Sequence, residues 1–180
     1  MLLILLTVVT LAIVSIAAYA ATRPDTFRIA RRTDIRAAPD AIFPLIEDLR
    51  SNEEWSPYYR KDPAMKGNYT GPARGAGAAF EFRGNKDVGA GRVTILDSAP
   101  PGKVTMRLQM FKPFSADNEV EFTLAPGKEA TEVTWAMQGK VPLLGKIMHL
   151  FIDCDRMVGR DFEVGLANLK SIVENRGVHA

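Results

Sequence analysis

Apolar and polar residues alternate through much of the second half of the chain. The pattern is clearest in three segments, residues 103–110, 119–124 and 131–138. Successive side chains of a β-strand point to opposite faces, so this alternation indicates strands with one buried and one solvated face, as in an antiparallel sheet. Weaker patterns predict three more strands, at residues 27–35, 78–83 and 92–96. The connections are short and rich in Gly and Pro, which predicts a meander of five or six strands.

The spacing of apolar residues changes after Pro142. From there they recur every three or four positions, at Leu143, Ile147, Leu150, Cys154, Val158, Phe162, Leu166, Leu169 and Val173. This spacing forms one apolar stripe on a long helix that ends near Gly177. The turns up to about Phe151 form either a separate helix or a bent extension. The sheet must bury the helix stripe, which is an α+β architecture.

Helical signals also follow the first predicted strand. Pro39 suits the first position of a helix and Asp40 its first turn, and apolar spacing extends this helix to about Leu49. Pro44 lies inside it, where we expect a kink or a helix restricted to its first turns. Residues 52–59 predict a second short helix or turn, and residues 62–77 a long ordered loop.

Residues 1–22 contain no charged side chain. At 1.5 Å per residue, a helix of this length crosses ~30 Å of hydrocarbon. We therefore interpret residues 1–22 as a transmembrane anchor and residues 26–177 as one domain. A cleaved signal peptide is the alternative, because Ala18-Tyr19-Ala20 has the small-x-small form of a cleavage site. Against it, no Lys or Arg precedes the apolar run, which exceeds the usual ~7–15 residues.

Several arginines follow the apolar segment closely. They are Arg23, Arg28, Arg31, Arg32 and Arg36. Under the positive-inside rule they favour a cytoplasmic location for the domain, at a cell membrane that the single N-terminal helix crosses. Several also fall in the first predicted strand, where charge is expected simply on the solvated face.

The composition argues against several classes of site. The net charge is only +2, with no basic stripe interleaved with aromatic residues, so no nucleic-acid partner is expected. Cys154 is the only cysteine, and His149 and His179 are the only histidines, which leaves too few soft ligands for structural zinc. His149 and Asp153 are four residues apart and predict a surface pair rather than a metal site. We expect no metal and no cofactor.

Two further motifs look more structural than chemical. Gly75-Ala76-Gly77 and Gly89-Ala90-Gly91 both precede strands and lack the strand–glycine–helix context of a phosphate loop, so turns or bulges are expected. Glu119 and Glu121 share a strand face but alternate with inward-pointing apolar residues, so they are expected to be solvated.

A curved sheet leaves space between its concave face and a straight helix, which side chains or a ligand must fill. The candidates for lining this space are Phe80, Phe82, Val93, Ile95, Met106, Leu108, Met110, Phe122, Trp135, Met137, Met157 and Phe162. Periodicity alone favours a solid core. Gly159 and Gly165 lie on or near the inner helix face and add no bulk. Trp55 and Tyr58 form either a gate at the pocket mouth or, for Trp55, a plug in the core.

Several motifs together carry a family resemblance. They include Ile35-Arg36-Ala37-Ala38-Pro39, Trp55-Ser56-Pro57, Tyr69-Thr70-Gly71-Pro72, Thr131-Glu132-Val133-Thr134-Trp135 and Gly159-Arg160-Asp161-Phe162-Glu163. From about Thr26 to Glu174 the chain resembles the SRPBCC superfamily, and within it the polyketide cyclase/dehydrase and lipid-transport group of START-like proteins.

The resemblance implies a helix-grip fold, in which a curved antiparallel sheet wraps around a long C-terminal helix. It also implies a hydrophobic cavity that takes lipids, sterols, polyketides or similar molecules, without a universal catalytic motif. The expected function is therefore a membrane-anchored protein that binds a hydrophobic or amphipathic small molecule. The alternatives are a cyclase- or dehydratase-type enzyme that uses the same pocket, and a membrane-bound regulator of a protein partner with a vestigial pocket.

Overall fold

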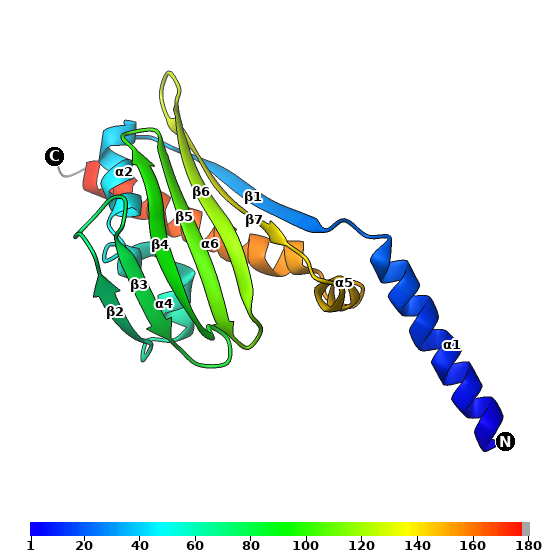
Figure 1. The fold of residues 1–180 in the computed structure, drawn as a ribbon. Coiled ribbons are helices and arrows are strands. Elements are labelled where there is room, and N and C mark those ends of the chain that lie inside the picture. Colours follow the sequence, from blue (N-terminus) through cyan, green and yellow to red (C-terminus); the bar gives the residue numbers. More distant parts are fainter. Residues whose placement is uncertain (178–180) are drawn as a thin grey trace.

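Seven antiparallel strands form one curved sheet in the computed structural model, which describes residues 1–177 (Figure 1). The strands are β1 (Thr26–Ile35), β2 (Lys66–Thr70), β3 (Ala79–Arg83), β4 (Ala90–Ala99), β5 (Lys103–Lys112), β6 (Ala116–Pro126) and β7 (Thr131–Lys140). Their order across the sheet is β1-β7-β6-β5-β4-β3-β2. Strands β3 to β7 are therefore the predicted meander, β2 extends it at one edge, and β1 closes the other edge against β7.

Six helices accompany the sheet. They are α1 (Leu2–Ala21), α2 (Pro39–Glu47), α3 (Asn52–Trp55), α4 (Pro57–Lys61), α5 (Leu143–His149) and α6 (Cys154–Gly177). The predicted α+β class and long C-terminal helix are confirmed. The turns after Pro142 form the separate helix α5, which residues 150–153 divide from α6.

One strand was missing from the sequence prediction. Residues 62–77 are not a continuous loop, because β2 lies within them and pairs with β3 at the sheet edge. Its sequence, Lys-Gly-Asn-Tyr-Thr, has Tyr69 as its only large apolar residue, so it shows no alternation. The sheet consequently has seven strands rather than five or six. β4 also begins earlier and ends later than predicted, because a bulge between Ile95 and Asp97 interrupts its alternation.

Pro44 does not shorten α2 to its first turns. The helix runs to Glu47, and the N–H of Asp48 donates to the carbonyl of Pro44 at 3.2 Å. Pro44 lies on the exposed side of the helix, where the carbonyl of Asp40 that it leaves without a donor is open to solvent.

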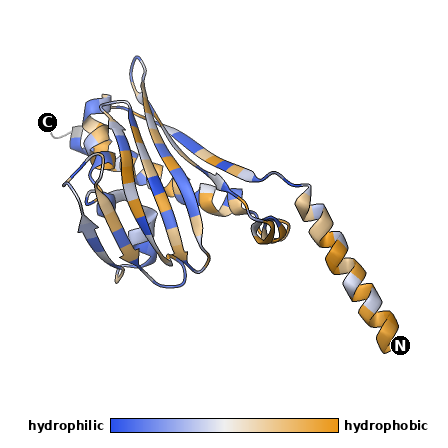
Figure 2. Cartoon of the chain, viewed as in Figure 1, coloured by the Kyte–Doolittle hydropathy of each residue, from blue (hydrophilic) through white to orange (hydrophobic). Residues whose placement is uncertain are grey.

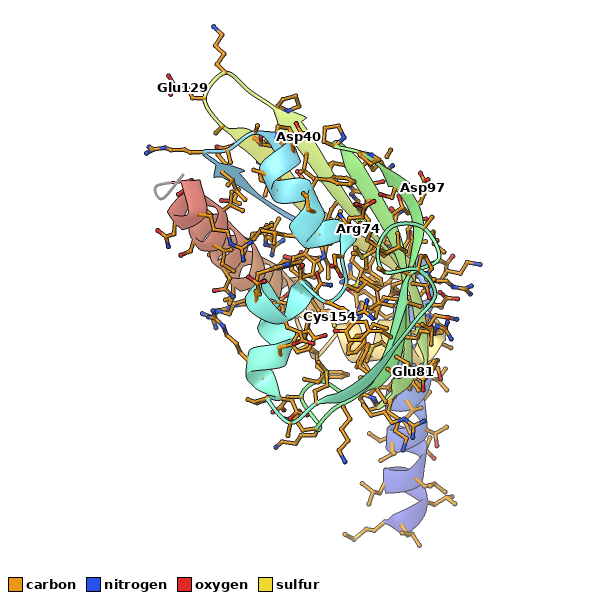
Figure 3. The ribbon with its side chains drawn as sticks, turned by 90° about the vertical axis from the view of Figure 1, so that its left-hand side faces the viewer. Asp40, Arg74, Glu81, Asp97, Glu129 and Cys154 are labelled. Atoms are coloured by element: carbon orange, nitrogen blue, oxygen red, sulfur yellow. The ribbon has the colours of Figure 1, made fainter. Side chains whose placement is uncertain are left out.

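The sheet and the helices form two layers (Figures 1 and 3). Helices α2, α3, α4 and α6 all lie on the concave side of the sheet, and the apolar core fills the space between the layers. The convex face is solvated and carries ion pairs such as Lys103–Glu121. The prediction that Glu119 and Glu121 are on the solvated face is confirmed by the partners of these side chains, Gln138 and Lys103.

Helix α1 stands apart from both layers and projects away from one end of the sheet (Figures 1 and 2). By length and composition it is apolar enough to cross a membrane, a property that a signal sequence shares. Its side chains are exposed except at its C-terminal end, where Ala20 is fully buried. The domain begins five residues after α1, at Thr26.

Candidate ligand-binding site

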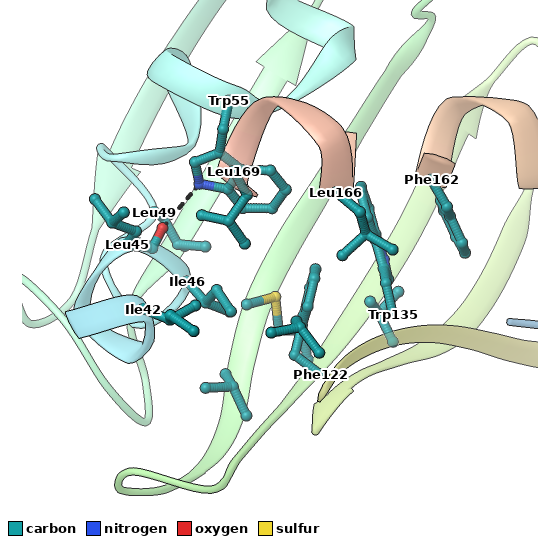
Figure 4. Close-up of a cluster of buried hydrophobic side chains, with 14 of the residues drawn as sticks. Ile42, Leu45, Ile46, Leu49, Trp55, Phe122, Trp135, Phe162, Leu166 and Leu169 are labelled. Carbon is teal, nitrogen blue, oxygen red and sulfur yellow. Dashed lines mark hydrogen bonds between the residues drawn. The ribbon is translucent and has the colours of Figure 1, made fainter. Parts of the chain in front are cut away.

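The concave face divides into two halves along the strands. In one half, α6 lies directly on the sheet, and the rings of Trp135 and Phe162 stack with centroids 4.1 Å apart (Figure 4). We call this the closed half. Its side chains are among the most deeply buried in the molecule, and they include Ile42, Ile46, Trp55, Phe122, Trp135, Phe162, Leu166 and Leu169. No separate guest is needed to fill this region.

Trp55 is part of the closed half. Only 2% of it is exposed, and its ring meets Phe122 and Trp135 edge to face. Its Nε1–H donates to the carbonyl of Leu45 at 2.9 Å, which joins α3 to α2. Trp55 is therefore a plug in the core and not a gate. Tyr58, the other gate candidate, is half-buried on α4.

Two glycines allow α6 to approach the sheet. A methyl group at Gly165 would lie 2.7 Å from the Trp135 ring and 3.1 Å from Pro57. A methyl group at Gly159 would overlap the guanidinium of Arg31. The prediction that both glycines lie on the inner face of α6 is confirmed.

Arg31 points from β1 into the interface with α6, in phase with the buried Ile29 and Ile35. Its Nε donates to Glu163 at 2.8 Å and its Nη2 to Asp155 at 2.9 Å. These hydrogen bonds, first that to Asp155, raise the pKa of Arg31, and the bond from Arg31 lowers the pKa of Asp155. The expectation that charge on this strand marks the solvated face is therefore correct for Arg28 and wrong for Arg31.

The other half of the concave face is less well covered. Val93, Leu108 and Met110 are only half-buried, although their strand register turns them toward the helices. Phe82 and Met137, which neighbour them on β3 and β7, each keep 8% exposure, whereas Ile42 and Ile46 in the closed half keep none. We call this surface the open half. All five of its residues were predicted to line the space between sheet and helix.

The remaining predicted lining residues fall outside the open half. Ile95, Met106, Phe122, Trp135 and Phe162 are buried in the core, and Phe80, which is 8% exposed, stacks between Tyr69 and Phe82. Met157, predicted to point inward, is instead 56% exposed, because Val158, Gly159 and Phe162 occupy the inner face of this part of α6.

Tyr59 and Tyr69 border the open half on its β2 side, where both stack on Phe80, and Tyr58 lies next to Tyr59 on α4. Tyr69 donates to Glu53 at 3.0 Å, and Tyr59 therefore supplies the proton of its 3.1 Å hydrogen bond to Tyr69. Burial is the main cause that raises the pKa of Tyr58, Tyr59 and Tyr69 above the usual phenol value. All three stay protonated at neutral pH, so they offer hydroxyl groups and no phenolate base.

Two polar groups lie on the concave face, the indole N–H of the predicted Trp135 and the amide of Asn118, which the sequence prediction did not include. Trp135 Nε1 is buried and has no hydrogen-bond partner among residues 1–177. Asn118 is 8% exposed on β6, and its Oδ1 lies over Gly139, where a methyl group would overlap it. The sequence could have placed Asn118 on this face, because it lies two residues before Val120 and four before Phe122, in step with the apolar positions of β6.

Two hollows open to solvent elsewhere on the domain. One, of about 470 Å³, lies between Phe27–Ile29 of β1 and residues 149–155 of the α5–α6 connection. The other, of about 760 Å³, is lined mainly by polar residues at the ends of β1, β6 and β7. Neither hollow is lined by Val93, Leu108 or Met110.

The predicted surface pair of His149 and Asp153 is wrong, because α5 ends at His149 and Asp153 lies in the connection to α6. His149 instead packs edge to face against Phe27, and Asp153 Oδ1 accepts from the N–H of Arg156 at 2.9 Å. The described part of the chain has no group of three or more His, Cys, Asp or Glu residues that could hold a metal ion. Gly75, Gly77 and Gly89 have positive φ angles, as the predicted turns require.

A family model described as polyketide cyclase / dehydrase and lipid transport matches residues 26–174, which is the whole sheet and nearly all of α6. The chain belongs to this family. The resemblance to the SRPBCC superfamily is thereby confirmed, and the match begins only after α1. None of the curated proteins compared with the chain matches it.

Many solved structures share the fold of this family member. The Aha1 dimer from Colwellia psychrerythraea is 18% identical, with a TM-score of 0.58 over 82% of this chain and 96% of its own. The di-domain ARO/CYC StfQ from the steffimycin biosynthetic pathway is 11% identical, with a TM-score of 0.61 over 84% of this chain and 52% of its own. Ginseng major latex-like protein 151 from Panax ginseng is 12% identical, with a TM-score of 0.56 over 82% and 97%. At these identities the likeness shows the fold alone.

Proposed function

We propose that this family member is a membrane-anchored protein that binds a hydrophobic or amphipathic small molecule on the open half of its concave sheet. The observation that carries the proposal is the partial exposure of Val93, Leu108 and Met110 on the face that the helices otherwise cover. A guest that covers these side chains gains about 25 cal/mol per Å² of apolar surface removed from water. The family, whose description includes lipid transport, supports a ligand of this class.

The polar atoms of the concave face favour a ligand with at least one oxygen. Asn118, which pairs with Leu108 across β5 and β6, offers an amide at the edge of the open half to which a ligand carbonyl, ester or hydroxyl oxygen can bond. A fatty acid, a sterol or a polyketide-like molecule meets this description.

Anchoring by α1 is the second part of the proposal. The helix is long and apolar enough to span a bilayer, and the domain starts directly after it. Such an anchor would hold the open half close to a reservoir of apolar molecules, so that a weak affinity would suffice for loading.

Cyclase chemistry on the same surface is the competing function, and the likeness to the ARO/CYC protein StfQ is the observation that favours it. An enzyme of this kind needs an acid or base that reaches the ligand. The hydroxyl of Tyr59, which stacks on Phe80, is a candidate, but its raised pKa keeps it protonated and makes it a weak acid, so it can offer a hydrogen bond rather than transfer a proton. Binding alone requires nothing beyond the apolar surface, so we prefer it.

The test is lipid extraction from the purified full chain, followed by mass spectrometry. We expect a stoichiometric apolar molecule in the wild type and its loss in Leu108→Trp, which fills the open half. Leu96→Trp is the matched control, because Leu96 is 49% exposed on the bulge of β4. Equal ligand content in both variants, each with wild-type circular dichroism, would place the ligand elsewhere and overturn the proposal. Chemical conversion of the extracted molecule on incubation with the wild type would favour the cyclase.

A further inference from the structure

Large exposed apolar side chains gather at one end of the domain. Three groups contribute, namely the β5–β6 turn, the start of α5 and the α5–α6 connection. The residues are Phe111, Phe114, Leu143, Leu144, Phe151 and Ile152, and we call them the end surface. Leu144 is 63% exposed and Phe151 75%. Outside α1, most of the large exposed apolar residues of the described chain belong to this surface.

The strand register places these groups together. Thr26, the first residue of β1, pairs with Lys140, the last residue of β7, so the end of α1 and the start of α5 meet there. Met110 pairs with Ala116, and Asn118 pairs with Gly139, so the β5–β6 turn with Phe114 lies at the same end of the sheet. Figure 1 shows α5 beside the domain end of α1, and Figure 2 shows that both are largely hydrophobic.

The connection between α1 and α5 is tight. Helix α5 packs against α1, where Ala20 is fully buried. Lys146 Nζ of α5 lies 2.6 Å from Asp25 Oδ1, and the N–H of Val141 donates to the carbonyl of Asp25 at 2.7 Å. Only residues 22–25 separate α1 from β1, and even fully extended they span at most ~14 Å. This end of the domain cannot move far from the end of α1.

The residues at the end of α1 indicate the depth of a bilayer surface. Arg23 donates to the hydroxyl of Tyr19 at 2.7 Å and lies over its ring. Tyr at the boundary of an apolar helix and a basic residue just beyond it are typical of the membrane–water interface. Since α5 contacts this same turn, its exposed leucines lie at the level of the lipid headgroups.

We infer that the end surface rests in the interfacial layer of the membrane that α1 crosses, which makes it a second, peripheral lipid contact of the domain. The inference rests on the proposed anchoring by α1. The exposed Lys112 and Lys140 lie at the same end of the sheet and add attraction to anionic headgroups. The hollow of about 470 Å³ is lined by Phe151 and Ile152, so it opens toward lipid and gives an acyl chain a place beside β1.

The test uses the full chain in phosphatidylcholine–phosphatidylglycerol vesicles with and without brominated acyl chains. Single cysteines carry an environment-sensitive fluorophore in a Cys154→Ser background, with Leu144→Cys and Phe151→Cys as probes of the end surface. Lys128→Cys, exposed on the β6–β7 turn at the opposite end of the sheet, is the matched control. Val9→Cys reports on α1 itself.

We expect brominated lipid to reduce the fluorescence at positions 9, 144 and 151 and to leave position 128 unchanged. Quenching at position 9 with none at 144 and 151 would overturn the inference and leave the anchor intact. No quenching at position 9 would overturn the anchor and the inference with it. Probes at 144 and 151 that are shielded from aqueous iodide but not quenched by lipid would show that a protein, or a second copy of the chain, covers this surface, which also overturns the inference.

Discussion

Trp55 and Trp135 are neighbours in the closed half, and their indole N–H groups differ in one respect. The N–H of Trp55 donates to the carbonyl of Leu45, whereas the buried N–H of Trp135 has no partner within residues 1–177. Both rings are almost fully buried and lie 5.6 Å apart, so they share one environment. Comparing the two tryptophans therefore measures how much a hydrogen-bonded buried donor contributes to the free energy of unfolding relative to an unbonded one.

We predict that Trp55→Phe lowers the free energy of unfolding more than Trp135→Phe does, by about 1–3 kcal/mol. The two variants lose the same side-chain volume. Trp55→Phe also leaves the Leu45 carbonyl without its donor, while Trp135→Phe removes a donor that was already unpaired. Urea denaturation of the full chain in detergent micelles, after lipid removal, measures the difference. A loss at Trp135 as large as that at Trp55 would mean that the Trp135 N–H has a partner in the ligand-free protein.

The alternating pattern predicts most of the residues that lie on the concave face. It correctly assigned Phe82, Val93, Leu108, Met110 and Met137 to one face. The same phase also places Arg31 and Asn118 on this face, although their polarity alone predicts a solvated position. Arg31 can lie on this face because Asp155 and Glu163, more than a hundred residues later, supply its partners. Such partners come from tertiary packing and leave no local signal in the sequence.

At the scale of elements, the sequence predicted best the helices and strands in which a periodic apolar pattern continues over many residues. The long stripe of α6 and the alternation of β5, β6 and β7 predicted these elements to within a few residues. β2 was not predicted, because this short edge strand has only one large apolar residue and shows no alternation. The sequence also did not predict the division of the concave face into two halves. This division depends on where α6 lies over the sheet, which neither the alternation of the strands nor the apolar stripe of α6 determines.

The position of α6 on the sheet depends on Gly165. We predict that Gly165→Ala lowers the free energy of unfolding by about 1–3 kcal/mol through overpacking, because the new methyl group meets the rigid Trp135 ring and Pro57. This loss outweighs the helix propensity that Ala adds, about 1 kcal/mol. Chemical denaturation of the full chain in micelles provides the measurement.

Gly159→Ala is the matched control on the same helix face. Its methyl group meets only the end of the flexible Arg31 side chain, which is partly exposed and can move aside. The ion pairs that Arg31 gives up are worth little at such exposure, so we expect a clearly smaller loss than for Gly165→Ala. If Gly159→Ala were the more destabilising variant, Arg31 rather than Trp135 would fix the position of α6.

At the scale of the whole molecule, the proposed anchor and the proposed ligand surface act from the same end of the sheet. Met110 of the open half pairs with Ala116, next to the turn that carries Phe114, and α1 joins the domain at the same end. An apolar molecule that leaves the bilayer beside α5 therefore has a short path to the open half. The opposite end, with the β4–β5 and β6–β7 turns, faces away from α1 (Figure 1).

The charges next to the proposed anchor α1 bear on the side of the membrane on which the domain lies. Arg23, Arg28 and Arg32 are exposed just beyond the helix, while residues 1–22 contain no charged side chain, so under the positive-inside rule we propose a cytoplasmic domain. We predict that a cysteine at Lys128→Cys, in a Cys154→Ser background, is protected from a membrane-impermeant maleimide in right-side-out vesicles. It should react fully in inverted vesicles, which serve as the control for accessibility. Labelling in right-side-out vesicles alone would place the domain on the outer side, and it would show that the paired Arg31 and the strand arginines of β1 serve the fold of the domain and not its topology.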